Sequence, residues 1–215
     1  LGWRHALVAL ALCNAAVCLP VHALLLRDEG HGAVSAMSAA DSGDAMRRAL
    51  RQPVFWGLAV AFTAYYGAFS AMTFHVIPLL TGRGLAMPLI VGAIAVIGPA
   101  QVAGRIVLFA LRGNLSTATA GTIAMIAFPL SIRVISLFPT PDYALFLFAL
   151  LYGAANGIIT IVRGTAVPEM MWREGYGAIN GALTLPGNVA KALAPFGAAA
   201  LWSAAGGYDA VLWAI

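Results

Sequence analysis

The sequence contains one lysine, Lys191, near the middle of an apolar stretch that runs from residue 176 to about residue 204. This stretch is longer than the roughly 20 residues that a helix needs to cross a bilayer. A cation at mid-depth costs roughly 2.5–3.5 kcal/mol on insertion scales, and a lysine stem cannot reach either headgroup layer from there. We therefore expect Lys191 to bind an anionic substrate or to take part in coupling. The alternative is that it pairs with a carboxylate and only stabilises packing.

Polar side chains also form stripes on one face of four apolar stretches, judged at 100° per residue. The stripes are Asn180, Thr184, Asn188 and Lys191; Tyr152, Asn156, Thr160 and Arg163; Thr63, Tyr66, Ser70 and Thr73; and Gln101 with Arg105. Polar stripes in lipid must turn toward protein or a wet cavity. For any single Ser or Thr an interhelical hydrogen bond is the alternative, but four stripes together predict a shared cavity.

A guanidinium binds a carboxylate through two parallel hydrogen bonds, and an ammonium adds a point charge. Two cations facing one dry cavity repel each other when it is empty, so an anion is favoured there. Snorkelling is the alternative for Arg105, and Arg112 and Arg163 are predicted to be boundary residues of the positive-inside kind. The predicted substrate-binding residues are Lys191, Arg105, Asn188, Thr184, Asn156, Tyr66 and Gln101.

His75 is the candidate for coupling, because it is the titratable side chain of physiological pKa within its stretch. The alternative is a partly hydrated packing histidine. No Asp or Glu lies deep in any apolar stretch. A buried carboxylate for proton coupling would therefore have to lie outside this sequence, unless the protein exchanges anions without a proton carrier. The sequence has no Ser/His/Asp set, nucleotide loop or metal-ligand spacing. We therefore expect no enzyme activity, no cofactor, no metal and no nucleic-acid partner.

The composition predicts which elements position these residues. The chain is 61% hydrophobic and 9% charged, with a mean hydropathy of +0.89, whereas soluble domains have about 25% charged residues. Because lipid requires a backbone that is hydrogen-bonded within itself, the apolar stretches predict an all-α membrane protein. The predicted helices cover residues 3–26, 54–80, 87–111, 118–138, 143–162 and 176–204, and a seventh begins near residue 208.

The connection over residues 27–53 is long and polar, which predicts a flexible linker with one surface helix around residues 44–50. It contains Arg27, Arg47, Arg48 and Arg51, so the positive-inside rule predicts that it is cytoplasmic. The excess of Arg over Lys, with abundant Ala and Gly, is typical of a GC-rich bacterial genome. We therefore expect a multi-pass protein of a bacterial plasma membrane.

The apolar stretches contain glycine pairs and prolines that can affect helix packing and shape. Gly153 with Gly157, and Gly177 with Gly181, form two GxxxG pairs that permit close approach of helices. Pro186 and Pro195 can kink the stretch that carries Lys191. Ordinary membrane packing is the alternative for each of these residues.

Two short motifs point to a family. Gly104-Arg105 precedes Leu111-Arg112-Gly113-Asn114, and Ala194-Pro195-Phe196-Gly197 precedes Gly206-Gly207-Tyr208-Asp209. With the helix–linker–six-helix order, these make the chain resemble the C-terminal half of a major facilitator superfamily transporter. The resemblance implies a six-helix half of a twelve-helix bundle plus one preceding helix, truncated at both ends. Residues 1–26 would end the N-terminal half, 27–53 would link the halves, and 54–215 would form the C-terminal bundle with an incomplete last helix.

Within that family, an arginine in helix 8 and a lysine in helix 11 resemble the oxalate:formate antiporter, and monocarboxylate transporters share the arginine. The resemblance implies secondary active transport of small organic anions, carboxylates in particular, by alternating access, with the lipid bilayer and the N-terminal half as partners. We expect no transport by this chain alone. Two alternatives stay open: a transporter or efflux pump of the same fold for a neutral or cationic solute or drug, and a non-transporting membrane sensor or assembly protein.

Overall fold

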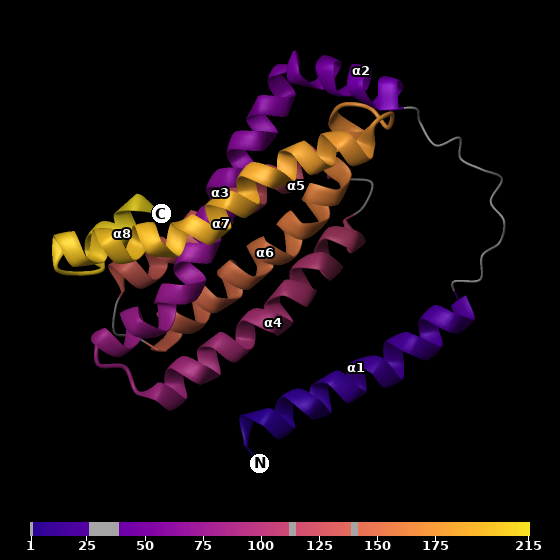
Figure 1. Ribbon diagram of the computed structural model, residues 1–215. Helices are drawn as coiled ribbons and strands as arrows, with labels where there is room; N and C mark the ends of the chain where they lie inside the picture. Colours follow the sequence, from indigo (N-terminus) through magenta and orange to yellow (C-terminus); the bar gives the residue numbers. More distant parts are fainter. Residues whose placement is uncertain (1, 26–38, 112–114, 139–141) are drawn as a thin grey trace. The chain divides into compact units, whose positions relative to one another are not determined.

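The computed structural model describes residues 2–25, 39–111, 115–138 and 142–215, and in these it contains eight α-helices and no strand (Figure 1). The helices are α1 (Trp3–Leu25), α2 (Ala39–Leu50), α3 (Pro53–Gly82), α4 (Met87–Ala110), α5 (Thr117–Leu137), α6 (Asp142–Met170), α7 (Tyr176–Ala205) and α8 (Asp209–Ala214). The chain divides into two units, residues 1–38 and 39–215. In the first unit α1 is exposed along nearly its whole described length.

Within the described ranges, five helices are long and apolar enough to cross a membrane, namely α1, α3, α4, α5 and α6. The expectation of an all-α, multi-pass membrane protein is therefore confirmed at this level. The sequence also predicted a spanning helix over residues 176–204. Helix α7 covers that stretch, but it is not among the five, although it is 30 residues long. Its two asparagines, four glycines and Lys191 make it less apolar than the others.

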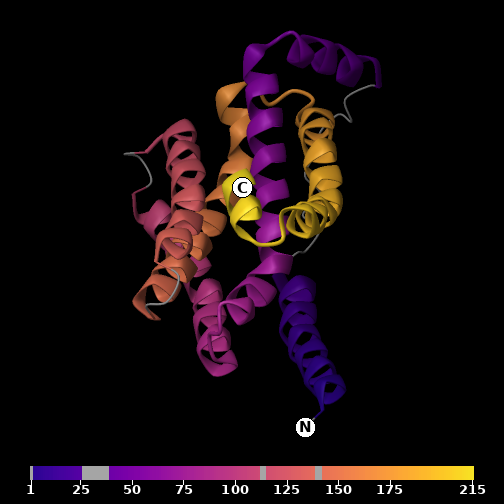
Figure 2. The same cartoon turned by 90° about the vertical axis from the view of Figure 1, so that its left-hand side faces the viewer.

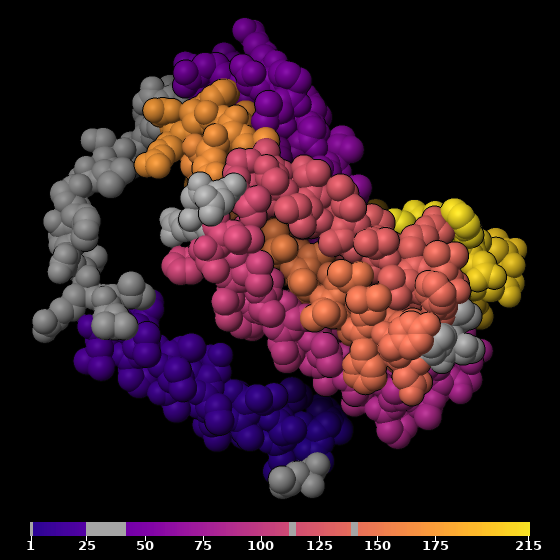
Figure 3. Space-filling view, turned by 180° about the vertical axis from the view of Figure 1, so that it is seen from behind, coloured from indigo at the N-terminus to yellow at the C-terminus, as the bar shows by residue number. Residues whose placement is uncertain are grey.

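The second unit is built from three closely packed helix pairs: α3 with α7, α4 with α6, and α5 with α6. Helices α4, α5 and α6 make up much of the face seen in Figure 3. At the α4–α6 crossing, a Cβ atom added to Gly104 would lie 2.6 Å from the carbonyl oxygen of Ala154. One added to Gly153 would lie 2.5 Å from the Ile97 oxygen, and one on Gly157 would clash with the Gln101 oxygen. We call Gly104, Gly153 and Gly157 the glycine seam.

The two GxxxG pairs therefore differ in the structure. Gly153 and Gly157 are both in the glycine seam, so the predicted close approach of helices is confirmed for this pair. Gly177 and Gly181 have no atom within 4 Å of an added Cβ, so the prediction is wrong for them. Their spacing matches, but their face of α7 is exposed.

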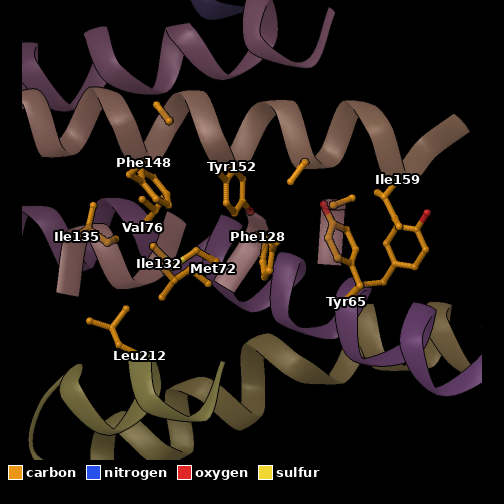
Figure 4. Close-up of a cluster of buried hydrophobic side chains, with 14 of the residues drawn as sticks. Tyr65, Met72, Val76, Phe128, Ile132, Ile135, Phe148, Tyr152, Ile159 and Leu212 are labelled. Atoms are coloured by element: carbon orange, nitrogen blue, oxygen red, sulfur yellow. The ribbon is translucent and has the colours of Figure 1, made fainter. Parts of the chain in front are cut away.

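Aromatic side chains connect α3 to α5 and α6. The ring centroids of Tyr65 and Phe128 are 4.8 Å apart, and those of Phe69 and Tyr152 are 4.9 Å apart in a stacked arrangement. Figure 4 shows Tyr65, Phe128 and Tyr152 in the core between these helices. Large rings, rather than small residues, thus set the spacing of α3 from α6.

One helix end differs clearly from the prediction. The fifth predicted helix stops at residue 162, but α6 continues to Met170, past Pro168. A proline has no N–H, so it leaves the carbonyl four residues earlier without its helical donor. Here that carbonyl belongs to Gly164, and the Tyr176 hydroxyl donates to it at 3.3 Å. The surface helix expected at residues 44–50 is confirmed and begins earlier, at Ala39; residues 26–38 of the predicted linker lie outside the described residues.

The glycine seam gives a direct test of packing. Replacing Gly157 with Ala should lower the free energy of unfolding by about 1–3 kcal/mol, because the methyl group meets the Gln101 carbonyl. The matched variant Gly181→Ala should raise it by up to about 1 kcal/mol through helix propensity alone. Thermal unfolding in detergent, followed by tryptophan fluorescence, would compare the two. Equal effects of both substitutions would contradict the close α4–α6 contact.

Candidate functional site

Three helices bring two cations to one aromatic ring. The Lys191 Nζ atom of α7 lies 4.1 Å from the centroid of the Tyr66 ring of α3, and the Arg163 Cζ atom of α6 lies 5.9 Å from the same centroid. Tyr66 is buried, and both cations are half-buried. The face of an aromatic ring carries negative charge density, which attracts a cation by about 0.5–2 kcal/mol depending on desolvation. We call Tyr66, Arg163 and Lys191 the cation cluster.

The cation cluster has an uncompensated positive charge among the described residues. No described carboxylate lies within 4.0 Å of Lys191 or Arg163. The ion pair found among the described residues is elsewhere, between Arg47 and Asp44 of α2. Two like charges around one ring repel each other, and a ring quadrupole offsets only part of that repulsion. The cluster is thus suited to accept an anion such as a carboxylate, to which a guanidinium can donate two hydrogen bonds.

A proline in α7 explains how Lys191 is held. Because Pro195 has no N–H, the carbonyl of Lys191 loses its helical donor. The Ser70 hydroxyl of α3 donates to that carbonyl at 2.7 Å. One turn further on, His75 Nε2 lies 3.0 Å from the Pro195 carbonyl. Helix α3 therefore contacts α7 at two carbonyls one turn apart, and Ser70 follows Tyr66 by one turn on the same helix face.

A pocket of about 310 Å³ lies between α3, α4 and α6, and it contains three polar side chains of the predicted stripes. They are Thr73, Gln101 and Tyr152. The Tyr152 hydroxyl lies 2.8 Å from Thr73 Oγ1 and donates to the Phe69 carbonyl at 3.0 Å. The remaining walls are apolar or aromatic: Phe69, Val76, Ile77, Ile94, Ile97, Gly98 and Phe148. We call this the aromatic pocket.

The cation cluster and the aromatic pocket lie along the same faces of α3 and α6. Tyr66 and Thr73 are seven residues apart on α3, and Tyr152 and Arg163 are eleven apart on α6, so each pair shares a helix face. At 1.5 Å per residue, the steps amount to about 10 Å on α3 and about 16 Å on α6.

The structure places the predicted site residues as follows. Lys191 and Tyr66 are in contact, and Gln101 lines the aromatic pocket. Asn156 is half-buried on α6, and Asn188 is exposed on α7. The Thr184 hydroxyl donates to the Asn180 carbonyl of its own helix at 2.6 Å.

The second cation beside Lys191 is Arg163 rather than Arg105. Arg105 is exposed on α4, one turn beyond Gln101. Arg163 was interpreted from the sequence as a boundary residue, yet it lies against the Tyr66 ring. A signal was available, because Arg163 falls on the same polar stripe as Tyr152, Asn156 and Thr160.

His75 lies away from the cation cluster. Its Nδ1 atom is 3.2 Å from the Tyr208 hydroxyl, and its Nε2 atom faces the Pro195 carbonyl. Both ring nitrogens thus have a partner, and the ring connects α3 to α7 and to the turn before α8. A role in coupling stays a prediction.

Removing the Ser70 hydroxyl tests how Lys191 is held. Ser70→Ala should lower the free energy of unfolding by about 1–3 kcal/mol, because the Lys191 carbonyl would be left without a donor in an apolar environment. Thr122→Ala is the matched control, since the exposed Thr122 hydroxyl donates only to Ala118 of its own helix. Thermal unfolding of both variants in detergent is the measurement. A Ser70→Ala variant as stable as Thr122→Ala would argue against the contact.

In comparisons with known proteins, no family model, no curated protein and no solved structure matches this chain.

Proposed function

We propose that this chain belongs to a secondary active transporter of small organic anions, carboxylates in particular, which works by alternating access. The observation that carries the proposal is the cation cluster, in which Lys191 and Arg163 flank Tyr66 without a described carboxylate between them. Membrane-embedded cations are retained where they serve a ligand or a water-filled path. The resemblance to the C-terminal half of a major facilitator superfamily transporter supports the same function, with residues 27–53 cytoplasmic in a bacterial plasma membrane.

The charge of the cluster indicates how transport would proceed. Closing a dry site around two cations is costly, because they are desolvated and repel each other. A bound carboxylate offsets that cost, with its oxygens accepting hydrogen bonds from Lys191 Nζ and the Arg163 guanidinium. The occupied site can then close and reopen on the other side of the membrane, while the empty site resists closing. This behaviour is that of an exchanger.

A second candidate is transport of a neutral or cationic solute or drug by the same fold. The aromatic pocket favours it, because its walls are mostly apolar and aromatic and its polar groups are neutral. Sites of this kind hold small uncharged molecules through a few placed hydrogen bonds. In that case Lys191 would act as an internal counter-ion.

Uptake into proteoliposomes that contain the full-length protein separates the two candidates. Labelled mono- and dicarboxylates would be compared with neutral and cationic solutes. We expect carboxylate uptake, and we expect Lys191→Ala and Arg163→Gln each to lower kcat/KM at least about tenfold through loss of a charge-assisted hydrogen bond. Arg173→Gln, which removes an exposed cation from the turn after α6, should have no effect.

Arg105→Ala belongs in the same series, because it was the cation predicted beside Lys191 from the sequence. A large loss in Arg163→Gln with a small loss in Arg105→Ala would assign the second cation to Arg163. Carboxylate uptake that does not respond to Lys191→Ala, or uptake of neutral solutes alone, would exclude the anion site and leave the second candidate.

Exchange is tested by loading the vesicles. Efflux of a labelled carboxylate should be at least about tenfold faster with unlabelled carboxylate outside than without it, because the empty cation cluster resists closing. Arg163→Gln should reduce this ratio, since one of the two repelling charges is gone. Equal efflux with and without external carboxylate would contradict the exchange mechanism.

A further inference from the structure

Helix α2 lies across the end of α3, as Figure 2 shows, and is fixed there by its alanine face. Ala45 and Ala49 are both fully buried, and Ala49 packs in a cluster with Phe55, Val167 and Ile179. The indole Nε1 of Trp56 also donates to the Leu50 carbonyl at 3.0 Å, which ties α2 to the first turns of α3. The orientation of α2 around its own axis is therefore set by packing.

That orientation leaves three arginines exposed. Arg47 and Arg48 lie in the last turn of α2, and Arg51 directly follows the helix, so the three fall within about one turn of chain. Arg47 is opposite Ala45 and Ala49 on the helix, whereas Arg48 is at the edge of the buried face. Arg48 lies over the Trp172 ring, with Cζ 5.6 Å from the centroid. Asp44 precedes all three arginines along the chain.

The arginines lie where the apolar surface of the bundle begins. Pro53 starts the spanning helix α3, and Val54, Trp56 and Val60 in its first turns are exposed apolar side chains. Exposed apolar side chains on a spanning helix face acyl chains, and tryptophan is enriched at the headgroup level. The arginine group of α2 is therefore at the height of the lipid headgroups.

We propose that Arg47 and Arg48 of α2, with Arg51 just after the helix, form a docking surface for the phosphate groups of anionic phospholipids. Phosphate oxygens accept two parallel hydrogen bonds from a guanidinium. The competing acid is weak: Asp44 is 4.0 Å from Arg47, and both side chains are more than three quarters exposed, a geometry that contributes little. Zwitterionic lipids carry their own cation beside the phosphate, so a basic surface favours the anionic ones.

Lipid binding by the purified full-length protein tests the proposal without any transport assay. Delipidated protein in detergent would be titrated with phosphatidylglycerol or phosphatidylcholine, and bound lipid counted by native mass spectrometry. We expect tighter binding of phosphatidylglycerol. The triple variant Arg47→Gln, Arg48→Gln, Arg51→Gln should lose about tenfold or more in phosphatidylglycerol affinity, with phosphatidylcholine unchanged. The triple Arg→Lys variant should keep most of the preference.

The Asp44→Asn substitution should change phosphatidylglycerol affinity in the opposite direction. It alters a single exposed side chain, so the fold should be unaffected. It should raise phosphatidylglycerol affinity about two- to fivefold, because one repelling charge is removed. Equal binding of the two lipids by the unsubstituted protein would overturn the proposal. The proposal would also be overturned if the triple Gln variant and Asp44→Asn preferred phosphatidylglycerol to the same degree.

Discussion

A backbone carbonyl that loses its helical donor in an apolar medium needs another one, and two prolines of the bundle create this need where helices meet. Pro168 and Pro195 each remove the donor of a carbonyl one turn earlier. Tyr176 donates to one of these carbonyls and Ser70 to the other. The first contact joins the start of α7 to the end of α6, and the second joins the middle of α7 to α3. Lys191 is placed beside Tyr66 because its own backbone is bound in this way.

Much of the helical fold follows from the sequence, because apolar stretches in lipid have few alternatives to helices. The errors occurred where a local signal was overridden by a partner elsewhere in the chain. Pro168 marks the end of a helix by its sequence, but Tyr176, twelve residues after Gly164, makes continuation possible. Likewise, Gly153 and Gly181 each belong to a GxxxG pair. Gly153 is crowded because a neighbouring helix packs against it, whereas Gly181 has no such neighbour.

The candidate site was predictable in part for a related reason. Helical periodicity gives the face on which Lys191, Tyr66 and Arg163 lie, but it does not give which helices are neighbours. The sequence therefore favoured Arg105 over Arg163 as the partner of Lys191, whereas α3, α6 and α7 meet at the Tyr66 ring and bring Arg163 there. The hydrogen bonds of Ser70 and His75 to backbone carbonyls could not be predicted from the sequence, because each depends on the register of α3 against α7.

The glycine seam divides the bundle into parts of unequal stiffness. Where backbones touch, as in α4 and α6, sliding of one helix along the other would drive atoms into each other, so these helices move as a single block with α5. Helix α3 meets that block through the aromatic rings of Tyr65, Phe69 and Tyr152, which can tilt and shift within their contacts. Small shear displacements are therefore concentrated between the α3–α7 pair and the block. The cation cluster and the aromatic pocket both span that boundary, so a ligand held there would act as a spacer that sets the width of the gap.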